Sequence, residues 1–286
     1  MRIIVGKYAG FCNGANTAVI KTNEALDGDK LYSVGDVIHN EEVINYLKKR
    51  GLIVKDSIND IPDNSRLIIR AHGESVGLYE EAKKRNISLV DLTCEKVKLI
   101  HNIIEDNKNS FIIIVGKKTH PEVIAHKSYN DANFVVDSID DINKAYNAYL
   151  ASGKSDVLVV TQTTFNIELF DRIVNEIKVV FKDTVINVEK TICPATRIRQ
   201  EEAKEIASKV DKMIVIGGKK SSNTKELEIV ARECCDRVYL IQTKDDLDKD
   251  MFSDDDIIGI TAGASTPKKL ISDVESYLES IYKNDK

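Results

Sequence analysis

Cysteine is the residue type in this chain whose number and spacing point most directly to chemistry. The 286 residues include five cysteines: Cys12, Cys94, Cys193, Cys234 and Cys235. An odd number of thiols argues against a framework of disulfides and in favour of metal binding or catalysis. Cys94 and Cys193 each end a strand-like run, Cys12 follows one, and a helix-like segment comes after all three. The sequence therefore predicts three thiols at junctions between strands and helices.

Three thiolates at equivalent places could form a metal site. They could hold zinc with a histidine or water, or three irons of a [4Fe–4S] cluster whose fourth iron stays open. Zinc sites usually contain close pairs such as C-x-x-C, and this sequence has none, which favours the cluster. A single cysteine at a strand end is more often a small buried hydrophobe, so this interpretation depends on the equivalence of all three. Cys234 and Cys235 are interpreted as packing residues.

The elements that would position the cysteines alternate along the whole chain. Short β-branched runs are followed by longer segments with apolar residues at i, i+3 and i+4, which is typical of βα units with mainly parallel sheets. Helices are predicted over residues 16–26, 95–107 and 195–210, each soon after a cysteine. The predicted strands cover residues 2–6, 30–37, 51–55, 66–71, 88–93, 111–116, 133–137, 156–162, 184–192, 212–218, 237–242 and 257–263.

The cysteines divide the chain into three repeats. Each repeat contains a helix, then four strands with helices between them, except that the last repeat lacks its fourth strand. The strand at 2–6 is the one left over, so we expect it to complete the third sheet. The predicted fold is α/β, with three pseudo-equivalent lobes of small, mainly parallel sheets around a central cavity where the three cysteines meet. The expected lobes are residues 12–94, 95–193 and 194–286, the last completed by 1–11.

Polar residues follow the first and third predicted strand of each repeat. Parallel sheets bind ligands beyond the carboxyl ends of their strands, so these loops should also face the cavity. The loop 217–223 fails the spacing of a phosphate loop, and neutral donors beside helix starts are better suited to a diphosphate without Mg²⁺. The residues after the first strands are His39-Asn40, His120-Pro121-Glu122 and Ser221-Ser222-Asn223, and those after the third strands are His72 to Ser75, Thr163-Thr164 and Ser265-Thr266.

We expect only the loop of the second repeat to place a carboxyl, that of Glu122, just past the His or Ser that opens the site. Glu122 is then a carboxylate in a predicted anion pocket, where like charges repel. It could carry a proton if its pKa were raised by a bound diphosphate and by partial burial, and Thr163 could pass that proton on. The alternative is a carboxylate that only accepts hydrogen bonds from amides at a helix start. His101 lies on an apolar helix face with Val97, Ile100 and Ile104 and is interpreted as a core histidine. His126 is assigned no role.

The composition excludes several classes of function. The chain is 42% hydrophobic and 30% charged, with a net charge of −5 and no basic tract, which argues against nucleic acid as the main partner. No apolar run is long enough for a membrane span, and the N-terminus lacks the features of a secretory signal. A soluble, cytoplasmic protein is expected.

Nine short motifs, in order and over nearly the whole chain, resemble the 4-hydroxy-3-methylbut-2-enyl diphosphate reductase family of the methylerythritol phosphate route to isoprenoids. The sequence departs from the family's usual pattern at Ala15, Thr17, Glu95 and Ala125. The motifs are GFCNG (10–14), HN (39–40), AHG (71–73), DLTC (91–94), HPEV (120–123), TQTT (161–164), TICPAT (191–196), SSN (221–223) and TAGAS (261–265).

The resemblance implies a reductive dehydroxylation that yields isopentenyl and dimethylallyl diphosphates. The substrate hydroxyl would bind the open iron of a [4Fe–4S] cluster, and a ferredoxin or flavodoxin could supply electrons. Glu122 matches the proton donor, with Thr163 and His120 in the same catalytic group. The positions that match cluster ligands are Cys12, Cys94 and Cys193, and those that match substrate-binding residues are His39, His72, His120, Thr163, Ser221, Ser222, Asn223 and Ser265.

Two other classes of protein stay open at this stage. An iron–sulfur sensor or carrier without turnover would explain the cysteines but not Glu122, Thr163 or the anion-binding loops. A zinc-stabilised binding protein would also use the thiols.

Overall fold

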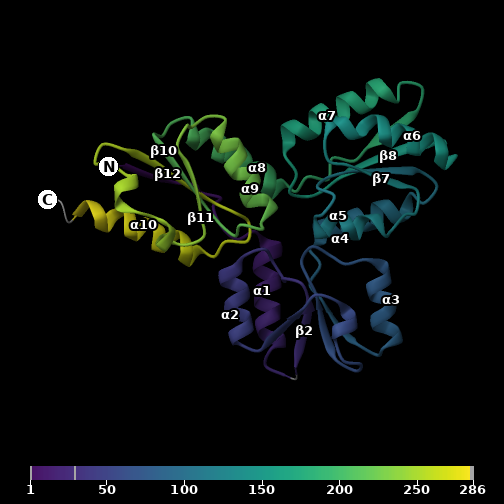
Figure 1. Ribbon diagram of the computed structural model, residues 1–286, viewed down its shortest axis with the longest axis horizontal. Coiled ribbons are helices and arrows are strands. Elements are labelled where there is room, and N and C mark those ends of the chain that lie inside the picture. Colours follow the sequence, from purple (N-terminus) through teal and green to yellow (C-terminus); the bar gives the residue numbers. More distant parts are fainter. Residues whose placement is uncertain (1, 29, 284–286) are drawn as a thin grey trace. The chain divides into compact units, whose positions relative to one another are not determined.

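The computed structural model describes residues 2–28 and 30–283, and the parts of the expected lobes at Met1, Asp29 and 284–286 lie outside these ranges. The described residues form twelve strands and ten α-helices, labelled in part in Figure 1. The strands are β1 Arg2–Val5, β2 Leu31–Val34, β3 Leu52–Lys55, β4 Arg66–Ile69, β5 Ser88–Asp91, β6 Phe111–Val115, β7 Asn133–Val136, β8 Asp156–Thr161, β9 Val185–Val188, β10 Lys212–Ile216, β11 Val238–Ile241 and β12 Ile257–Ala262. The helices are α1 Asn13–Ala25, α2 Glu41–Lys49, α3 Val76–Lys84, α4 Glu95–Asp106, α5 Pro121–Lys127, α6 Ile142–Ser152, α7 Ile167–Val180, α8 Pro194–Ala207, α9 Ser222–Arg232 and α10 Lys268–Lys283.

The strands form three parallel sheets with the same internal order. The orders are β3-β2-β4-β5, β7-β6-β8-β9 and β11-β10-β12-β1. In each, the first strand of the repeat lies between the second and the third, and the fourth pairs with the third. The N-terminal strand takes the fourth place in the last sheet, with Arg2 opposite Ile257 and Val5 opposite Ile260. The prediction of three α/β lobes, the last completed by the N-terminal strand, is confirmed.

The second sheet is buried on both faces, as expected for parallel strands covered by helices. Successive residues of β6 point to opposite faces. Ile113 and Val115 belong to a core with α6 and α7, whereas Ile112 and Ile114 belong to a core with α4 and α5. Figure 1 shows these two helix pairs on either side of the strands.

The third sheet follows the same arrangement. Met213 and Val215 pack with α8 and α9, and Ile214 and Ile216 pack in the core that includes α10. Cys235 is buried in the first of these cores, and Cys234 packs against it. This agrees with the interpretation of the adjacent cysteines as packing residues.

Contacts divide the chain into two compact units. One consists of Met1–Val19, Ile38–Lys49 and Pro194–Lys286, and the other consists of Ile20–Val37 and Arg50–Cys193. The first unit holds the third sheet, and the second unit holds the first two sheets. The boundaries expected for the three lobes stay predictions.

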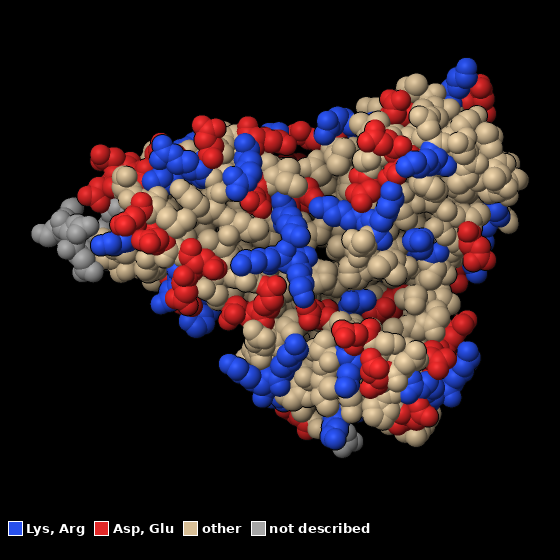
Figure 2. All heavy atoms as spheres, viewed as in Figure 1, with Lys and Arg blue, Asp and Glu red and all other residues tan. Residues whose placement is uncertain are grey.

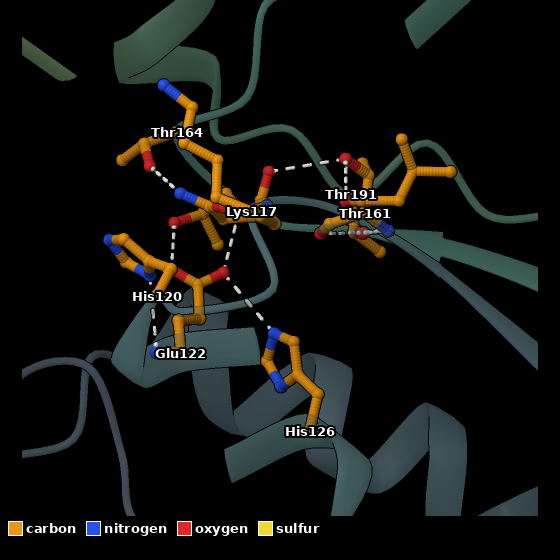
Figure 3. Close-up of polar contacts among 10 residues, drawn as sticks. Lys117, His120, Glu122, His126, Thr161, Thr164 and Thr191 are labelled. Atoms are coloured by element: carbon orange, nitrogen blue, oxygen red, sulfur yellow. Dashed lines mark hydrogen bonds and ion pairs between the residues drawn. The ribbon is translucent and has the colours of Figure 1, made fainter. Parts of the chain in front are cut away.

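The strand before Cys193 is shorter than predicted. It was expected over residues 184–192, but β9 ends at Val188. Beyond that point the amide of Glu189 still donates to the carbonyl of Val159 at 2.9 Å. Two residues further on, the hydroxyl of Thr191 accepts a hydrogen bond from the amide of Thr161 at 2.8 Å and donates to the carbonyl of the same residue at 2.7 Å (Figure 3). The main chain can therefore leave the sheet before it reaches the cysteine.

Charged side chains of both signs cover each lobe on the face drawn in Figure 2. Several are helix pairs four residues apart, such as Lys209 with Glu205 at 2.6 Å and Lys269 with Asp273 at 2.9 Å. Exposed pairs of this kind contribute little to stability and keep a helix face solvated. Among the described residues, no helix combines the length and the apolar composition that a membrane span requires.

Candidate active site

The three cysteines at strand-to-helix junctions are held by the same main-chain hydrogen bond. The amide of Cys94 donates to the carbonyl of Ala71 at 3.0 Å, that of Cys193 to Thr163 at 3.0 Å, and that of Cys12 to Ala264 at 2.9 Å. Each acceptor lies two residues beyond the end of the third strand of its lobe, which is β4, β8 or β12. None of these three cysteines forms a disulfide, and all three are partly exposed. Within its own lobe, each cysteine thus occupies an equivalent place.

The helices after the first strands begin with side-chain caps at predicted site residues. His120 Nδ1 accepts the amide of Glu122 at 3.2 Å, and Ser221 Oγ accepts the amide of Thr224 at 3.3 Å. Asn40 caps α2 in the same way by accepting the amide of Val43 at 3.2 Å. These caps satisfy helix amides that would otherwise lack acceptors.

Glu122 lies in the first turn of α5 and is almost fully buried, with 1% of its surface exposed. Its Oε1 accepts the amide of Thr163 at 2.6 Å, and its Oε2 accepts the hydroxyl of Thr163 at 2.8 Å. Figure 3 shows the carboxylate between α5 and the loop that follows β8. The sequence suggested only partial burial; the loop of Thr163 covers the carboxylate completely because it binds both oxygens.

Electrostatics at Glu122 favour the ionised form in this structure. Burial raises the pKa of Glu122, but the hydrogen bond and charge of His126, the charge of His120 and the amide of Thr163 outweigh burial and hold the pKa below its ordinary value. Burial lowers the pKa of His120, and the neighbouring Glu122 opposes that change only in part. The expected increase in the pKa of Glu122 requires a bound diphosphate and stays a prediction.

His126 is a site residue that the sequence interpretation missed. It lies four residues after Glu122 on α5, is fully buried, and its Nε2 is 3.3 Å from Glu122 Oε1. Residues four apart on a helix share a face, so the spacing itself was the signal that could have identified it. Its ring meets the edge of His101 at 5.0 Å between centroids.

The first lobe contributes His72 to the same unit. The rings of His72 and His120 meet edge to face with centroids 5.5 Å apart. The next residue, Gly73, has φ of +75°, and a Cβ there would lie 2.7 Å from Cε1 of His101. The AHG motif therefore needs glycine both for its backbone and for the close approach of α4. His101 and the three apolar residues of its helix face are buried, as predicted.

The other unit brings together most of the remaining predicted residues. Asn223, in the first turn of α9, accepts the amide of Ala264 at 2.9 Å. Ser265 donates its hydroxyl to the carbonyl of His39 at 3.0 Å. Ser222 and Ser265 are buried, and Asn223 has 3% of its surface exposed. The loops that carry these side chains thus touch one another within the unit.

The chemistry available in the two units differs. The unit of Asn223 offers neutral hydroxyl and amide groups at helix starts, which suit an anion. The unit of Glu122 offers a buried carboxylate in direct hydrogen bond with a hydroxyl, which suits proton transfer. Partly exposed cysteines that form no disulfide and lie at the starts of helices fit the donor set of an iron–sulfur cluster.

Comparison with known proteins agrees with this arrangement. Residues 3–279 match the family model described as LytB protein. The chain is 39% identical over 287 residues to 4-hydroxy-3-methylbut-2-enyl diphosphate reductase of Clostridioides difficile (strain 630), covering 98% of this chain and 100% of that protein. It is 38% identical over 282 residues to the protein of the same name from Thermoanaerobacter sp. (strain X514), covering 96% and 95%.

Two solved structures are also similar. The E-1-hydroxy-2-methyl-but-2-enyl-4-diphosphate reductase from Plasmodium falciparum superimposes with a TM-score of 0.88 at 30% identity, covering 97% of this chain and 87% of that one. The structure described as (E)-4-hydroxy-3-methyl-but-2-enyl diphosphate reductase, the terminal enzyme of the non-mevalonate pathway, gives a TM-score of 0.69 at 35% identity, covering 98% and 100%. This chain therefore belongs to the LytB protein family.

Proposed function

We propose that this protein catalyses the reductive dehydroxylation of (E)-4-hydroxy-3-methylbut-2-enyl diphosphate to isopentenyl diphosphate and dimethylallyl diphosphate. Curated relatives that match it over nearly their whole length carry the name of that reductase. In the reaction the allylic C–O bond breaks and a C–H bond forms. Two electrons and two protons are consumed, and the hydroxyl leaves as water.

One observation carries the proposal beyond the relatives' names. Thr163 binds Glu122 through its amide and its hydroxyl, and its carbonyl accepts the amide of Cys193. The pair of Glu122 and Thr163, which suits proton transfer, is thus joined by one main-chain hydrogen bond to a cysteine whose thiol could hold a redox group. Reductive loss of a hydroxyl requires protons and electrons at the same place, and this contact supplies the residues for both.

For the cofactor, we propose a [4Fe–4S] cluster held by Cys12, Cys94 and Cys193. The absence of disulfides at these three cysteines, their partial exposure and their equivalent main-chain hydrogen bonds support this set. When bound, such a cluster would supply electrons and one iron open to a ligand. A ferredoxin or flavodoxin is the class of one-electron donor that we expect to reduce it.

For the diphosphate, we propose binding by neutral donors and helix starts. Buried Ser222, Asn223 and Ser265 offer hydroxyl and amide groups, and Ser221 lies at the start of α9. His39, His72, His120 and the hydroxyl of Thr163 complete the proposed binding set. We expect a Mg²⁺-selective chelator to leave substrate affinity nearly unchanged, and a tenfold weakening, about 1.4 kcal/mol, would contradict this anion site.

In turnover, Glu122 would hold the proton that Thr163 passes toward the leaving hydroxyl. Burial of the carboxylate excludes water from the pair, so the proton moves between two fixed oxygens. The diphosphate charge would raise the pKa of Glu122 and so favour the protonated form that can donate. His120, which caps the same helix turn, would keep the carboxyl close to the substrate.

The decisive experiment is anaerobic purification followed by iron and sulfide analysis and a turnover assay. We expect a brown protein that bleaches in air, and oxidation of the reduced protein when the substrate is added. A cluster without substrate-dependent oxidation would indicate a sensor or carrier. A colourless, air-stable protein with one zinc per chain would indicate a binding protein instead.

Cysteine variants separate the proposed ligands from the packing cysteines. Serine at position 12, 94 or 193 should lower the iron content, whereas Cys234→Ser and Cys235→Ser should not. Equal loss of iron in all five variants would exclude the proposed ligand set.

A further inference from the structure

His126 and Glu122 form a buried pair on one face of α5. His126 has no exposed surface, and its Nε2 lies 3.3 Å from Glu122 Oε1. The same oxygen accepts the amide of Thr163, so Oε2 is left to the hydroxyl of Thr163. Figure 3 shows the imidazole pointing from the helix toward the carboxylate. The orientation of the carboxyl group is therefore set from both sides.

The surroundings of His126 decide which ring nitrogen carries the proton. Nδ1 is buried and has no hydrogen-bond partner among the described residues. A buried N–H without an acceptor is costly, so the proton of the neutral ring belongs on Nε2, where Glu122 accepts it. The ring is thus a donor to Oε1.

The other titratable groups around this pair do not compete for Oε1. His101, on α4, meets the ring of His126 edge to face, and burial first and the charge of His126 second lower the pKa of His101 to about 3, so it is neutral near pH 7. Tyr129 stacks on the ring of His101, with centroids 4.1 Å apart. His120 Nδ1 accepts the amide of Glu122, and the charge of Asp91 opposes the lowering of the pKa of His101.

We propose that His126 is a positioning residue that holds Glu122 in the orientation from which Oε2 exchanges a proton with Thr163. Its effect on turnover rests on the proposed function, whereas its effect on the carboxylate does not. Without His126, Glu122 would lose the two largest contributions that lower its pKa, and the pKa of the carboxyl would rise. Oε1 would keep only the amide of Thr163, and the side chain would be less fixed.

Three variants test this proposal. His126→Leu keeps a buried side chain but removes the donor, and His126→Gln places an amide donor near the position of Nε2. Val123→Ala is the matched control, because Val123 is equally buried on the same helix and packs in the core cluster of α4 and α5. The control should lower stability without altering the carboxylate.

The kinetic measurement is the pH profile of kcat in the cluster-loaded protein. We expect His126→Leu to lower kcat about tenfold or more with little change in KM, because a misplaced proton donor slows the chemical step. The alkaline limb should move to higher pH, since Glu122 would stay protonated to higher pH. His126→Gln should regain most of the rate, and Val123→Ala should leave the limb in place. An unmoved limb in His126→Leu, or equal damage from leucine and glutamine, overturns the proposal.

Two NMR measurements test the positioning role of His126 without any measurement of turnover. Carboxyl ¹³C titration, with Glu122 assigned through Glu122→Gln, should give a higher pKa in His126→Leu than in the wild type. ¹⁵N labelling of the five histidines should show that Nε2 of His126 carries a proton. An unchanged titration or the Nδ1–H tautomer overturns the proposal. Loss of substrate turnover in the wild type would refute the proposed function and leave these two results valid.

Discussion

The loops that follow the first strands of the second and third lobes share one hydrogen-bond frame, in which a carboxylate of the second lobe takes the place of an amide side chain in the third. Glu122 and Asn223 each occupy the second residue after a helix cap, His120 or Ser221. Each accepts an amide from two residues beyond the third strand of its own lobe: Thr163 at 2.6 Å for Glu122, and Ala264 at 2.9 Å for Asn223. The comparison sets a carboxylate beside an amide side chain at the same place in this frame.

That difference separates proton transfer from anion binding. The carboxylate of Glu122 can only accept while ionised, and its second oxygen takes the hydroxyl of Thr163. The amide of Asn223 keeps a donor, and its buried Nδ2 has no hydrogen-bond partner among the described residues. A buried, unpaired donor is costly unless a ligand accepts it, which supports Asn223 as an anion contact.

The first lobe also places carboxyl groups just beyond the residue that caps its helix. The sequence interpretation held that only the second lobe places a carboxyl just beyond the residue that opens the site. In the structure Glu41 and Glu42 follow the cap Asn40 directly, and Glu42 is exposed. What distinguishes Glu122 is therefore its burial against Thr163 and not the presence of a carboxyl in the loop.

Replacing the carboxylate is expected to have the largest effect. Glu122→Gln keeps size and hydrogen bonding but cannot deliver a proton, so turnover should fall about 10²-fold or more. The measurement is single-turnover oxidation of the reduced protein by the substrate, with iron content and substrate binding confirmed as intact. Near-normal turnover would remove Glu122 from the mechanism.

Removing the hydroxyl partner should have a smaller effect. Thr163→Val deletes the bond to Oε2 but keeps the main-chain amide that binds Oε1, so we expect about a thirtyfold loss of kcat, the equivalent of one hydrogen bond to a charged group. Thr163→Ser should retain most of the rate. If serine and valine reduce kcat equally, the hydroxyl is not the group that matters.

Replacing Asn223 of the third lobe by a carboxylate, as in the second lobe, should weaken substrate binding rather than slow the chemical step. Asn223→Asp replaces a donor by a negative charge in the proposed diphosphate pocket, so Kd for the substrate should rise about tenfold, or about 1.4 kcal/mol. Isothermal titration under anaerobic conditions measures this change. An unaltered Kd would place the diphosphate away from α9.

The smallest expected effect is on stability in acid. The pKa of Glu122 is below its ordinary value of 4.5, because the partners of the carboxylate outweigh the effect of burial. A lowered pKa adds stability above about pH 4.5 that is lost as the pH falls through the folded-state pKa. The free energy of unfolding should therefore fall more steeply below pH 4.5 in the wild type than in Glu122→Gln. Urea titrations at several pH values, with equal iron content, measure both slopes, and parallel slopes would show that the carboxyl is not stabilised by its partners.

The sequence by itself determined the elements and the repeat. Period-two and helical patterns are local, so twelve strands and the helices after the three cysteines could be located from neighbouring residues alone. The leftover strand at the N-terminus could then be assigned to the third sheet by counting. The contact of Glu122 with His126 is equally local, because residues at i and i+4 share a helix face, and the spacing of the two residues predicts it.

Which loops meet within each unit, and how far their side chains are buried, depends on the tertiary structure. Thr163 reaches Glu122 across 41 positions, and Ala264 reaches Asn223 across 41, because adjacent parallel strands end at the same edge and bring their loops together. The hydroxyl of Thr191 bonds the main chain of Thr161 beyond the end of β9, a contact that no strand pattern encodes. Burial of Glu122 likewise depends on the register of β6 against β8. Such contacts depend on strand pairing between distant segments. The spacing of residues along the chain could therefore suggest which residues belong to the site, but it could not predict their contacts.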